Sequence, residues 1–119
     1  MVVEAALDRK AEDVTVLDMN ACSSFTDYFV ICHGRGTRQV RAISDKVEEK
    51  LKEAKIRPAH IEGYNAGEWI LMDYIDFVVH IFTGEKRKYY GIEKLWADAP
   101  QVALDGARQK AFDKRGGTD

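Results

Sequence analysis

The sequence predicts a single α/β (α+β) domain, with a mixed β-sheet of about five strands and flanking helices. Short β-branched and aromatic segments alternate with segments in which apolar residues recur every three or four positions. Gly, Asn and Asp residues mark the turns between these segments. The length of 119 residues suits one hydrophobic core and leaves little room for a second.

The amino-terminal segment is predicted to form a short amphipathic helix followed by two adjacent strands. The helix covers residues 3–11, where apolar residues recur at four-residue spacing. The strands cover residues 14–17 and 28–32, which are apolar runs bounded by polar turn residues. We expect Cys32 to lie inside the second strand. Cys32 and Cys22 are both expected to be reduced, because they form neither a CxxC motif nor a disulfide framework.

The clearest helix covers residues 38–54, because apolar residues recur there at spacings of three and four while charged residues occupy the other side. The apolar positions are Val40, Ile43, Val47 and Leu51. The Gly-rich turn before it, residues 34–37, ends a strand and provides Thr37 as the N-cap. A further strand at residues 56–62 contains Pro58, which predicts a place at the edge of the sheet.

Residues 68–73 and 76–82 are predicted to form a hairpin closed by the two-residue loop Tyr74-Ile75, with Trp69 opposite His80. In this register one face is purely apolar and belongs to the core: Ile70, Met72, Phe77, Val79 and Ile81. The other face is mixed: Trp69, Leu71, Asp73, Asp76, Val78 and His80. A longer loop is the alternative, because a β-branched residue such as Ile75 resists the positive φ of a tight turn.

A last helix is predicted over residues 84–99, with Pro100 near its end. Its apolar stripe is Ile92, Leu95, Trp96 and Ala99. Residues 1–100 therefore make up the domain. Residues 101–119 contain few large apolar side chains and are expected to form a mobile tail.

The charge balance favours a basic protein as the partner. A net charge of -2 and a pI near 5.9 argue against a broad phosphate-neutralising surface, so no direct nucleic-acid readout is expected. The apolar runs are too short to cross a membrane, and the first residues do not resemble a targeting peptide. We therefore expect a cytoplasmic protein.

No motif indicates catalysis, and we expect no enzyme, catalytic residue, cofactor or metal. The turn at residues 34–37 lacks the lysine of a P-loop and the third glycine of a dinucleotide fingerprint. The alternative is a nucleotide-binding or nucleotidyltransferase-like enzyme that uses the Gly34-Thr37 turn. Such an enzyme needs paired carboxylates on the next strand, where His60-Ile61-Glu62 offers only one. The three histidines and two cysteines show no metal-binding spacing.

Aromatic and charged residues are concentrated between residues 63 and 96, and this segment is predicted to bind a partner. The aromatic residues are Trp69, Tyr74, Tyr89, Tyr90 and Trp96, of which we expect Trp96 to be in the core. Acidic side chains lie between them. Aromatic anchors surrounded by carboxylates are typical of a surface that binds a basic protein.

Four segments together resemble the ribosomal silencing factor RsfS family, also called the Iojap family, over about residues 3–99. They are residues 26–30 (TDYFV), residues 62–63 leading to 69–74 (WILMDY), residues 76–82 (DFVVHIF) and residues 87–96 (RKYYGIEKLW). The resemblance implies a nucleotidyltransferase-like fold without its activity. It further implies binding to large-subunit ribosomal protein fourteen, which sterically blocks association of the two ribosomal subunits and represses translation when nutrients are limiting.

By the same resemblance, we expect the partner to contact Trp69, Leu71, Asp73, Tyr74, Asp76 and His80, with Arg87 and Tyr90 in support. The chain departs from the family pattern at two positions. Ile75 stands where the family usually has Gly, and Gly91 stands where Leu is common. The glycine is expected to weaken the last helix by ~1 kcal/mol relative to Ala. A homodimeric scaffold, paired through a strand edge or a sheet face, is a third hypothesis.

Overall fold

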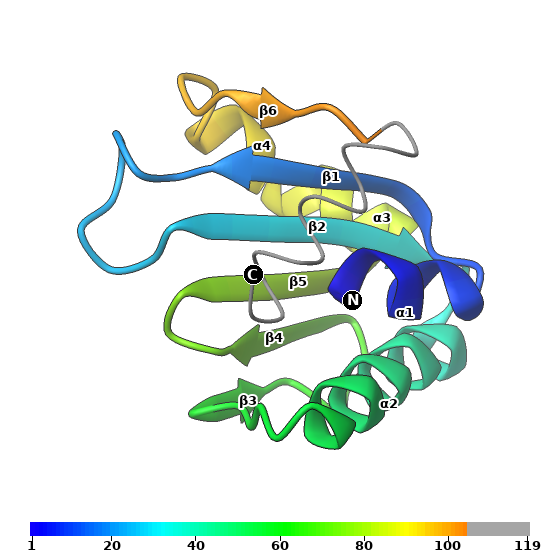
Figure 1. Ribbon diagram of the computed structural model, residues 1–119. Coiled ribbons are helices and arrows are strands. Elements are labelled where there is room, and N and C mark those ends of the chain that lie inside the picture. Colours follow the sequence, from blue (N-terminus) through cyan, green and yellow to red (C-terminus); the bar gives the residue numbers. More distant parts are fainter. Residues whose placement is uncertain (105–119) are drawn as a thin grey trace.

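A mixed sheet forms the centre of the computed structural model, which describes residues 1–104 (Figure 1). The helices are α1 (Val2–Asp8), α2 (Thr37–Glu53), α3 (Gly84–Tyr90) and α4 (Ile92–Leu95). The strands are β1 (Glu12–Asp18), β2 (Tyr28–Gly34), β3 (His60–Glu62), β4 (Trp69–Asp73), β5 (Phe77–Thr83) and β6 (Gln101–Val102). Within the described residues their order is β3-β4-β5-β2-β1-β6, and only the β2–β5 pair is parallel. The predicted α+β class is confirmed, with β6 as a strand beyond the expected five.

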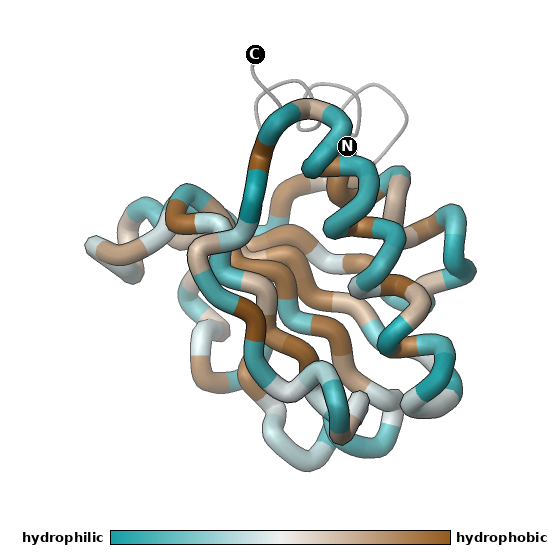
Figure 2. Tube along the Cα trace, turned by 90° about the horizontal axis from the view of Figure 1, so that it is seen from below, coloured by the Kyte–Doolittle hydropathy of each residue, from teal (hydrophilic) through white to brown (hydrophobic). Residues whose placement is uncertain are grey.

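Two helices, α1 and α2, cover one face of the sheet, while α3 and α4 lie on the other (Figure 1). The first face carries the larger core, in which the strand residues Ile70, Met72, Phe77, Val79 and Ile81 are buried as predicted. Against them packs the predicted stripe of α2: Val40, Ile43, Val47 and Leu51. The most apolar stretches of the chain accordingly run through the central strands (Figure 2).

Most element positions agree with the prediction to within a few residues. The helix expected at 38–54 is α2, although its N-cap is Gly36 in an extended conformation and Thr37 is already helical. The strand expected at 56–62 is shorter and lies at the sheet edge as β3. Cys32 lies in β2, where complete burial raises the pKa of its thiol to about 12. Both cysteines are free.

The predicted register of the β4–β5 hairpin is wrong by two residues. Trp69 pairs with Phe82 and Leu71 pairs with His80. The Tyr74 amide donates to the Phe77 carbonyl at 2.9 Å, so the two-residue loop is Ile75-Asp76. Because side chains alternate with a period of two, a shift of two leaves each residue on its predicted face.

Side-chain and backbone contacts of the hairpin turn explain why the loop is Ile75-Asp76 and not the predicted Tyr74-Ile75. Ile75 adopts a positive φ of 74°. Its amide donates to Oδ1 of Asp73 at 2.8 Å, which is the turn role expected for one of the two aspartates. The Asp76 amide closes a γ-turn onto the Tyr74 carbonyl at 2.9 Å. The Asp76 carbonyl accepts a hydrogen bond from the Asp27 amide at 2.8 Å, which ties the turn to the start of β2.

The predicted helix over residues 84–99 is interrupted. Gly91 has left-handed dihedrals (φ 54°, ψ 40°) and ends α3, after which α4 runs in a new direction. The glycine therefore terminates a helix instead of weakening a continuous one. As a result Leu95 is 74% exposed, whereas Ile92, Trp96 and Ala99 pack on the second core.

The predicted tail begins in ordered structure. Gln101 and Val102 form β6, which pairs with Leu17 and Val16 of β1, and Val102 also packs on the core. The remainder of that tail, residues 105–119, lies outside the described residues. Among the helices of residues 1–104, none has the length and apolar character to cross a bilayer.

Candidate functional site

The second face of the sheet is only partly covered. Its buried core consists of Leu17, Met19, Ile31, Phe82, Ile92 and Ala99. Beyond that core lie apolar side chains that are half-buried or exposed, which we call the open face: Phe29, Trp69, Leu71, Val78 and Tyr90. The strands β4, β5 and β2 are neighbours in the sheet, and their registers place the strand residues of this set on the same face. Large apolar side chains therefore reach solvent over the middle of the sheet.

Trp69 is held in one orientation by three neighbouring rings. Its indole stacks on Phe82, with ring centroids 5.0 Å apart, and lies 4.7 Å from the ring of Tyr90. Its Nε1 donates a hydrogen bond to Nδ1 of His80 at 3.1 Å. A fixed aromatic side chain at a half-buried position loses little entropy when a partner covers it.

His80 is buried beneath the open face. Because its Nδ1 accepts the bond from Trp69, the proton of the neutral ring is on Nε2. Burial lowers the pKa of His80 to about 4, so the imidazole is uncharged at neutral pH. Phe29 packs edge-on against it at 4.6 Å. With 4% of its surface exposed, His80 orients Trp69 and offers little surface to a partner.

The open face is acidic at its hairpin end, where β4 ends and β5 begins. Asp73 is half-buried at the end of β4, and Asp76 is exposed in the hairpin loop. Tyr74 lies between them in sequence but points to the opposite face. There it is 6% exposed and stacks on Phe77 at 5.0 Å, and burial raises the pKa of its phenol. The structure thus does not bring Tyr74 to the open face.

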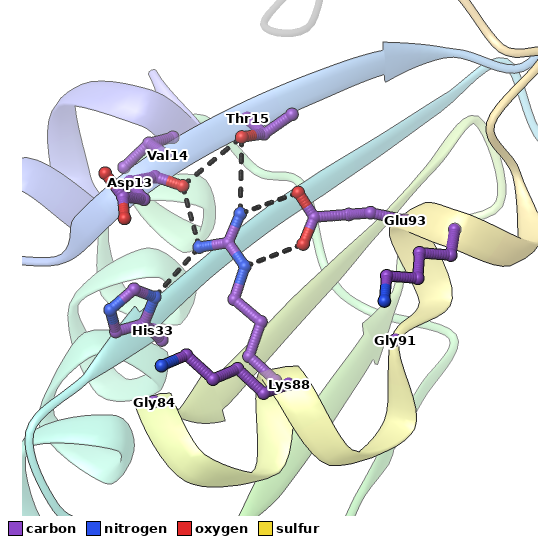
Figure 3. A pocket seen from close by; sticks show the side chains of 10 residues that line it. Asp13, Val14, Thr15, His33, Gly84, Lys88, Gly91 and Glu93 are labelled. Atoms are coloured by element: carbon purple, nitrogen blue, oxygen red, sulfur yellow. Dashed lines mark hydrogen bonds and ion pairs between the residues drawn. The ribbon is translucent and has the colours of Figure 1, made fainter.

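Arg87 lies in a network of internal contacts, with only 10% of its side chain exposed. Its guanidinium makes a two-point ion pair with Glu93, at 2.8 and 3.0 Å. It also donates to the Asp13 carbonyl and to His33 Nδ1, at 2.8 and 2.9 Å, and to Thr15 Oγ1 at 3.3 Å. Figure 3 shows these partners converging on one point. The hydrogen bonds to Arg87 also lower the pKa of Glu93.

A β-bulge in β1 makes this network possible. Between Glu12 and Thr15 the register with β2 shifts, and Asp13 has a positive φ of 47°. The bulge frees the Asp13 carbonyl from the ladder, and the Arg87 guanidinium satisfies it. Arg87 therefore joins α3, β1, β2 and the start of α4, and its donors are used inside the molecule.

Of the predicted contact residues, the structure gathers Trp69, Leu71, His80 and Tyr90 at the open face, with Asp73 and Asp76 at its end. Tyr74 and Arg87 lie elsewhere. Sequence reasoning did not include Phe29 and Val78 among the contact residues, although both lie on the open face. Val78 had been placed on the mixed face, and alternation along residues 28–32 would have added Phe29.

The Gly34-Thr37 turn is occupied by a protein side chain. Gln39 Oε1 accepts a bond from the Arg35 amide at 2.8 Å, and its Nε2 donates to the carbonyls of Arg9 and Lys10. A Cβ on Gly34 would lie 3.1 Å from Gln39, so the glycine accommodates this glutamine. Within residues 1–104, no group of three or more His, Cys, Asp or Glu side chains is arranged to hold a metal ion.

The fold and the open face together define a class: a small α+β domain with large apolar side chains exposed over one face of its sheet. A family model described as "Ribosomal silencing factor during starvation" matches residues 1–119, so the chain belongs to the ribosomal silencing factor RsfS family. This confirms the resemblance drawn from the sequence. The family comprises ribosome regulators and not enzymes, in agreement with the prediction that the chain is no enzyme.

Individual relatives support the assignment. The chain is 43% identical over 106 residues to the ribosomal silencing factor RsfS of Halalkalibacterium halodurans, covering 89% of this chain and 91% of that protein. A crystal structure from Chromobacterium violaceum is similar, with a TM-score of 0.79 and 38% identity over 81% of this chain and 80% of the other. "Mitochondrial assembly of ribosomal large subunit protein 1" of Mus musculus is 33% identical over 81% of this chain, which spans 43% of the mouse protein.

Proposed function

We propose that the chain binds the large ribosomal subunit through a basic ribosomal protein, large-subunit protein fourteen. By occupying that surface it blocks association of the small subunit and represses translation in the cytoplasm when nutrients are limiting. Membership in the RsfS family supports this proposal, as does the mouse relative, whose name refers to assembly of the large subunit.

The open face is the observation that carries the proposal. Trp69 is an aromatic anchor held by Phe82, Tyr90 and His80, and Leu71 beside it is half-buried. Protein interfaces draw most of their affinity from such rigid anchors at the centre of the contact. The aspartates Asp73 and Asp76 at its end give the rim the charge that attracts a basic partner.

Blocking by occupation requires a rigid body and no chemistry. The chain has principal extents of 33 × 32 × 27 Å. A standard protein interface buries about 800 Å² on each partner. A domain of this size bound by one sheet face therefore projects well beyond its own contact and excludes a second large particle from the same place.

Co-sedimentation with purified large subunits tests the contact. We expect Leu71→Asp to weaken binding by at least about tenfold, because the carboxylate would be buried without a partner at the interface. The matched control is Leu7→Asp, since Leu7 is a 45% exposed leucine on the opposite side, in α1. Thermal unfolding of both variants verifies that each is folded. Equal binding by the two variants would remove the open face as the contact.

The charged rim has its own matched pair. Asp76→Lys should lower the association rate with isolated protein fourteen, and the difference from the unsubstituted chain should shrink as salt rises. Glu49→Lys makes the same change of charge on the exposed side of α2 and should leave the rate nearly unchanged. Stopped-flow tryptophan fluorescence measures the rate.

Subunit joining tests the mechanism separately from the contact. Mixing small and large subunits raises light scattering as they associate, and the chain should abolish this rise once large subunits are saturated. Leu71→Asp should restore it. Binding of the chain without any loss of joining would exclude steric blocking while leaving the contact intact.

We further propose that the fold is related to the nucleotidyltransferase-like superfamily without its activity. In support, the strand after α2, where an active member would carry paired carboxylates, has only one, Glu62, which hydrogen-bonds to His60. Calorimetry with Mg-nucleotides should give no heat of binding. A homodimer formed through β3 is disfavoured, because an edge of three residues with two charged or polar side chains is a poor template for strand pairing.

A further inference from the structure

The net charge of the chain conceals a difference in charge between the two ends of the strands. Acidic residues gather at the hairpin end of the sheet: Asp18, Asp27, Asp73 and Asp76. Basic residues gather at the other end, where β2 leads into α2 and α1 leads into β1: Arg9, Lys10, Arg35 and Arg38. They outnumber the acids of the same connections, which are Asp8, Glu12 and Asp13. The two ends are on opposite sides in Figure 1. A summed charge near zero therefore says little about the local field.

One side chain brings the basic residues together. Gln39 Nε2 donates to the carbonyls of Arg9 and Lys10, at 3.0 and 2.9 Å, while its Oε1 accepts from the Arg35 amide at 2.8 Å. Two segments of the chain, the α1–β1 connection and the β2–α2 turn, thus meet around one glutamine amide. Arg38 precedes this glutamine in the first turn of α2. We call this group of four cations the basic end.

The ion pairs of the fold do not account for these cations. Arg9, Lys10 and Arg38 are exposed and make no ion pair with any described residue, and Arg35, 89% exposed, meets Glu12 at 3.3 Å. The first turn of α2 contains Arg38 and no acidic residue. A cation at the amino end of a helix opposes the helix dipole. An acidic residue at this position would stabilise the helix better than Arg38 does.

The positive surface continues into the hollow drawn in Figure 3, which Lys88 and Lys94 line together with His33. His33 joins the two regions, because its Nε2 lies 3.5 Å from the same Glu12 carboxylate that pairs with Arg35. Two acids line the hollow: Glu93 is neutralised by the two-point contact with Arg87, whereas Asp13 is exposed and leaves one carboxylate beside the two lysines. Neither lysine has an ion-pair partner among residues 1–104.

We propose that the basic end and the adjoining hollow bind the sugar-phosphate backbone of RNA without reading its sequence. Guanidinium groups match the geometry of phosphate oxygens, and several exposed cations on one surface follow a phosphate chain. Such contacts position a protein on RNA and carry no sequence information. This inference rests on the proposed function for its location on the ribosome. The RNA is then the ribosomal RNA that lies beside the basic protein partner.

This surface gives the chain two contacts of opposite charge. The acidic rim of the open face attracts a basic protein, and the basic end attracts phosphate. Because the two lie at opposite ends of the same strands, a particle built of basic protein and RNA would fix the orientation of the domain. Two linked contacts also raise the affinity above that of either one alone.

Fluorescence anisotropy with a fluorescein-labelled RNA hairpin of twenty nucleotides, at 50 mM KCl, tests the inference. The triple variant Arg9→Glu, Lys10→Glu, Arg38→Glu should bind at least about tenfold more weakly. For this variant, the slope of log K against the logarithm of the salt concentration should be smaller in magnitude by about 2. The matched control is Lys50→Glu, Lys52→Glu, Lys55→Glu, which makes the same charge change at the far end of α2 and should lose less than about threefold.

Several results would overturn the inference. They are no RNA binding by the unsubstituted chain, equal losses in the two triple variants, or no loss in the basic-end variant. Tighter binding of polyglutamate with the same charge would assign the surface to an acidic protein instead. Circular dichroism establishes that both variants are folded.

Large-subunit co-sedimentation separates this inference from the proposed function. RNA binding that depends on the basic end, without sedimentation on large subunits, would overturn the proposed function alone. Sedimentation that is lost in Leu71→Asp, together with RNA binding that is unchanged in the basic-end variant, would overturn the RNA contact alone. If both hold, the basic-end variant should sediment less than the unsubstituted chain, and this difference should be larger at 50 mM than at 200 mM KCl.

Discussion

The indole of Trp69 and the imidazole of His80 share a hydrogen bond of 3.1 Å across the β4–β5 hairpin. The two residues are diagonal neighbours, since Trp69 pairs with Phe82 and His80 pairs with Leu71. The bond needs an unprotonated Nδ1, so the orientation of the half-buried tryptophan depends on a buried neutral histidine. A surface anchor is thereby linked to the protonation of a core residue.

Stability should fall as the pH drops through the range set by His80. Burial lowers the pKa of this group from 6.5 to about 4, so between these values the unfolded chain binds a proton that the folded chain does not. Stability contributed by neutral His80 is thus complete above about pH 6.5 and is lost as the pH falls toward 4. We expect a loss of about 3 kcal/mol from this group. Urea unfolding at pH 7, 6, 5 and 4 measures this loss, of which about 2 kcal/mol is expected between pH 7 and 5.

His80→Gln is the control for that experiment. Glutamine accepts a hydrogen bond from Trp69 but does not titrate, so the variant should be less stable at pH 7 and vary less between pH 7 and 5. The other titrating groups contribute equally to both proteins. An identical pH profile for the two chains would show that His80 does not cause the loss.

Arg87 should matter for stability more than for partner contact. Removing a nearly buried charge leaves its partner unpaired, so Arg87→Ala should cost about 3 kcal/mol in urea unfolding. Arg87→Lys retains the charge but not the fork that reaches Glu93 and the Asp13 carbonyl, and should still cost about 2 kcal/mol. Lys88→Ala, one residue along α3, should change stability by less than about 0.5 kcal/mol.

The role of Arg87 in binding can be measured at low temperature, where Arg87→Lys remains folded. Retained co-sedimentation with large subunits would agree with a purely internal role. A loss of binding in a variant with unchanged circular dichroism would make Arg87 a contact residue, as the family resemblance implied.

Ile75 is a strained position whose replacement should stabilise the fold. A β-branched residue at φ 74° is unfavourable, and its side chain is 59% exposed, so little packing is lost on removal. Ile75→Gly should raise the free energy of unfolding by about 1 kcal/mol, after allowing for the greater entropy of the unfolded glycine chain. Ile75→Val retains the branch and should have almost no effect. Thermal unfolding of the three proteins decides, and a destabilised glycine variant would refute the strain.

Gly63 should tolerate no side chain. It has a φ of 79°, and a Cβ there would lie 2.1 Å from the carbonyl oxygen of Trp69. Gly63→Ala must therefore displace the start of β4, at a cost of about 3 kcal/mol, and should weaken large-subunit binding through Trp69. The control is Gly36→Ser, where nothing lies within 4 Å of the new Cβ and serine is a good N-cap. Equal melting temperatures for the two variants would contradict this reasoning.

Local pattern was sufficient to predict the elements that bury one face. The stripe of α2 and the alternation along β4 and β5 depend only on the helical and strand periods, and both were confirmed. The same alternation predicts an inward Tyr74, because Tyr74 has the parity of Met72. The family motifs, which take no account of this parity, led to the expectation that Tyr74 contacts the partner.

Other features depend on contacts between residues far apart in sequence. The hairpin loop is fixed partly by the Asp27 amide, which the hairpin sequence does not contain. Gly91 ends a helix that periodicity alone continues to residue 99. The partners of Arg87 in β1 lie more than seventy residues away from it, so no local motif reveals them.

The sequence by itself determined the α+β class, the inward face of the hairpin, the long helix and the family, because each follows from short-range periodicity or from motifs within one segment. Only the tertiary structure decided which side chains share a surface. It placed Phe29 and Trp69 against the same buried His80, made Arg87 internal, and brought the segments of Arg9, Lys10, Arg35 and Arg38 together around Gln39. The physical reason is that the chemistry of a surface depends on the distances between segments of the chain. Composition and net charge contain no information about these distances.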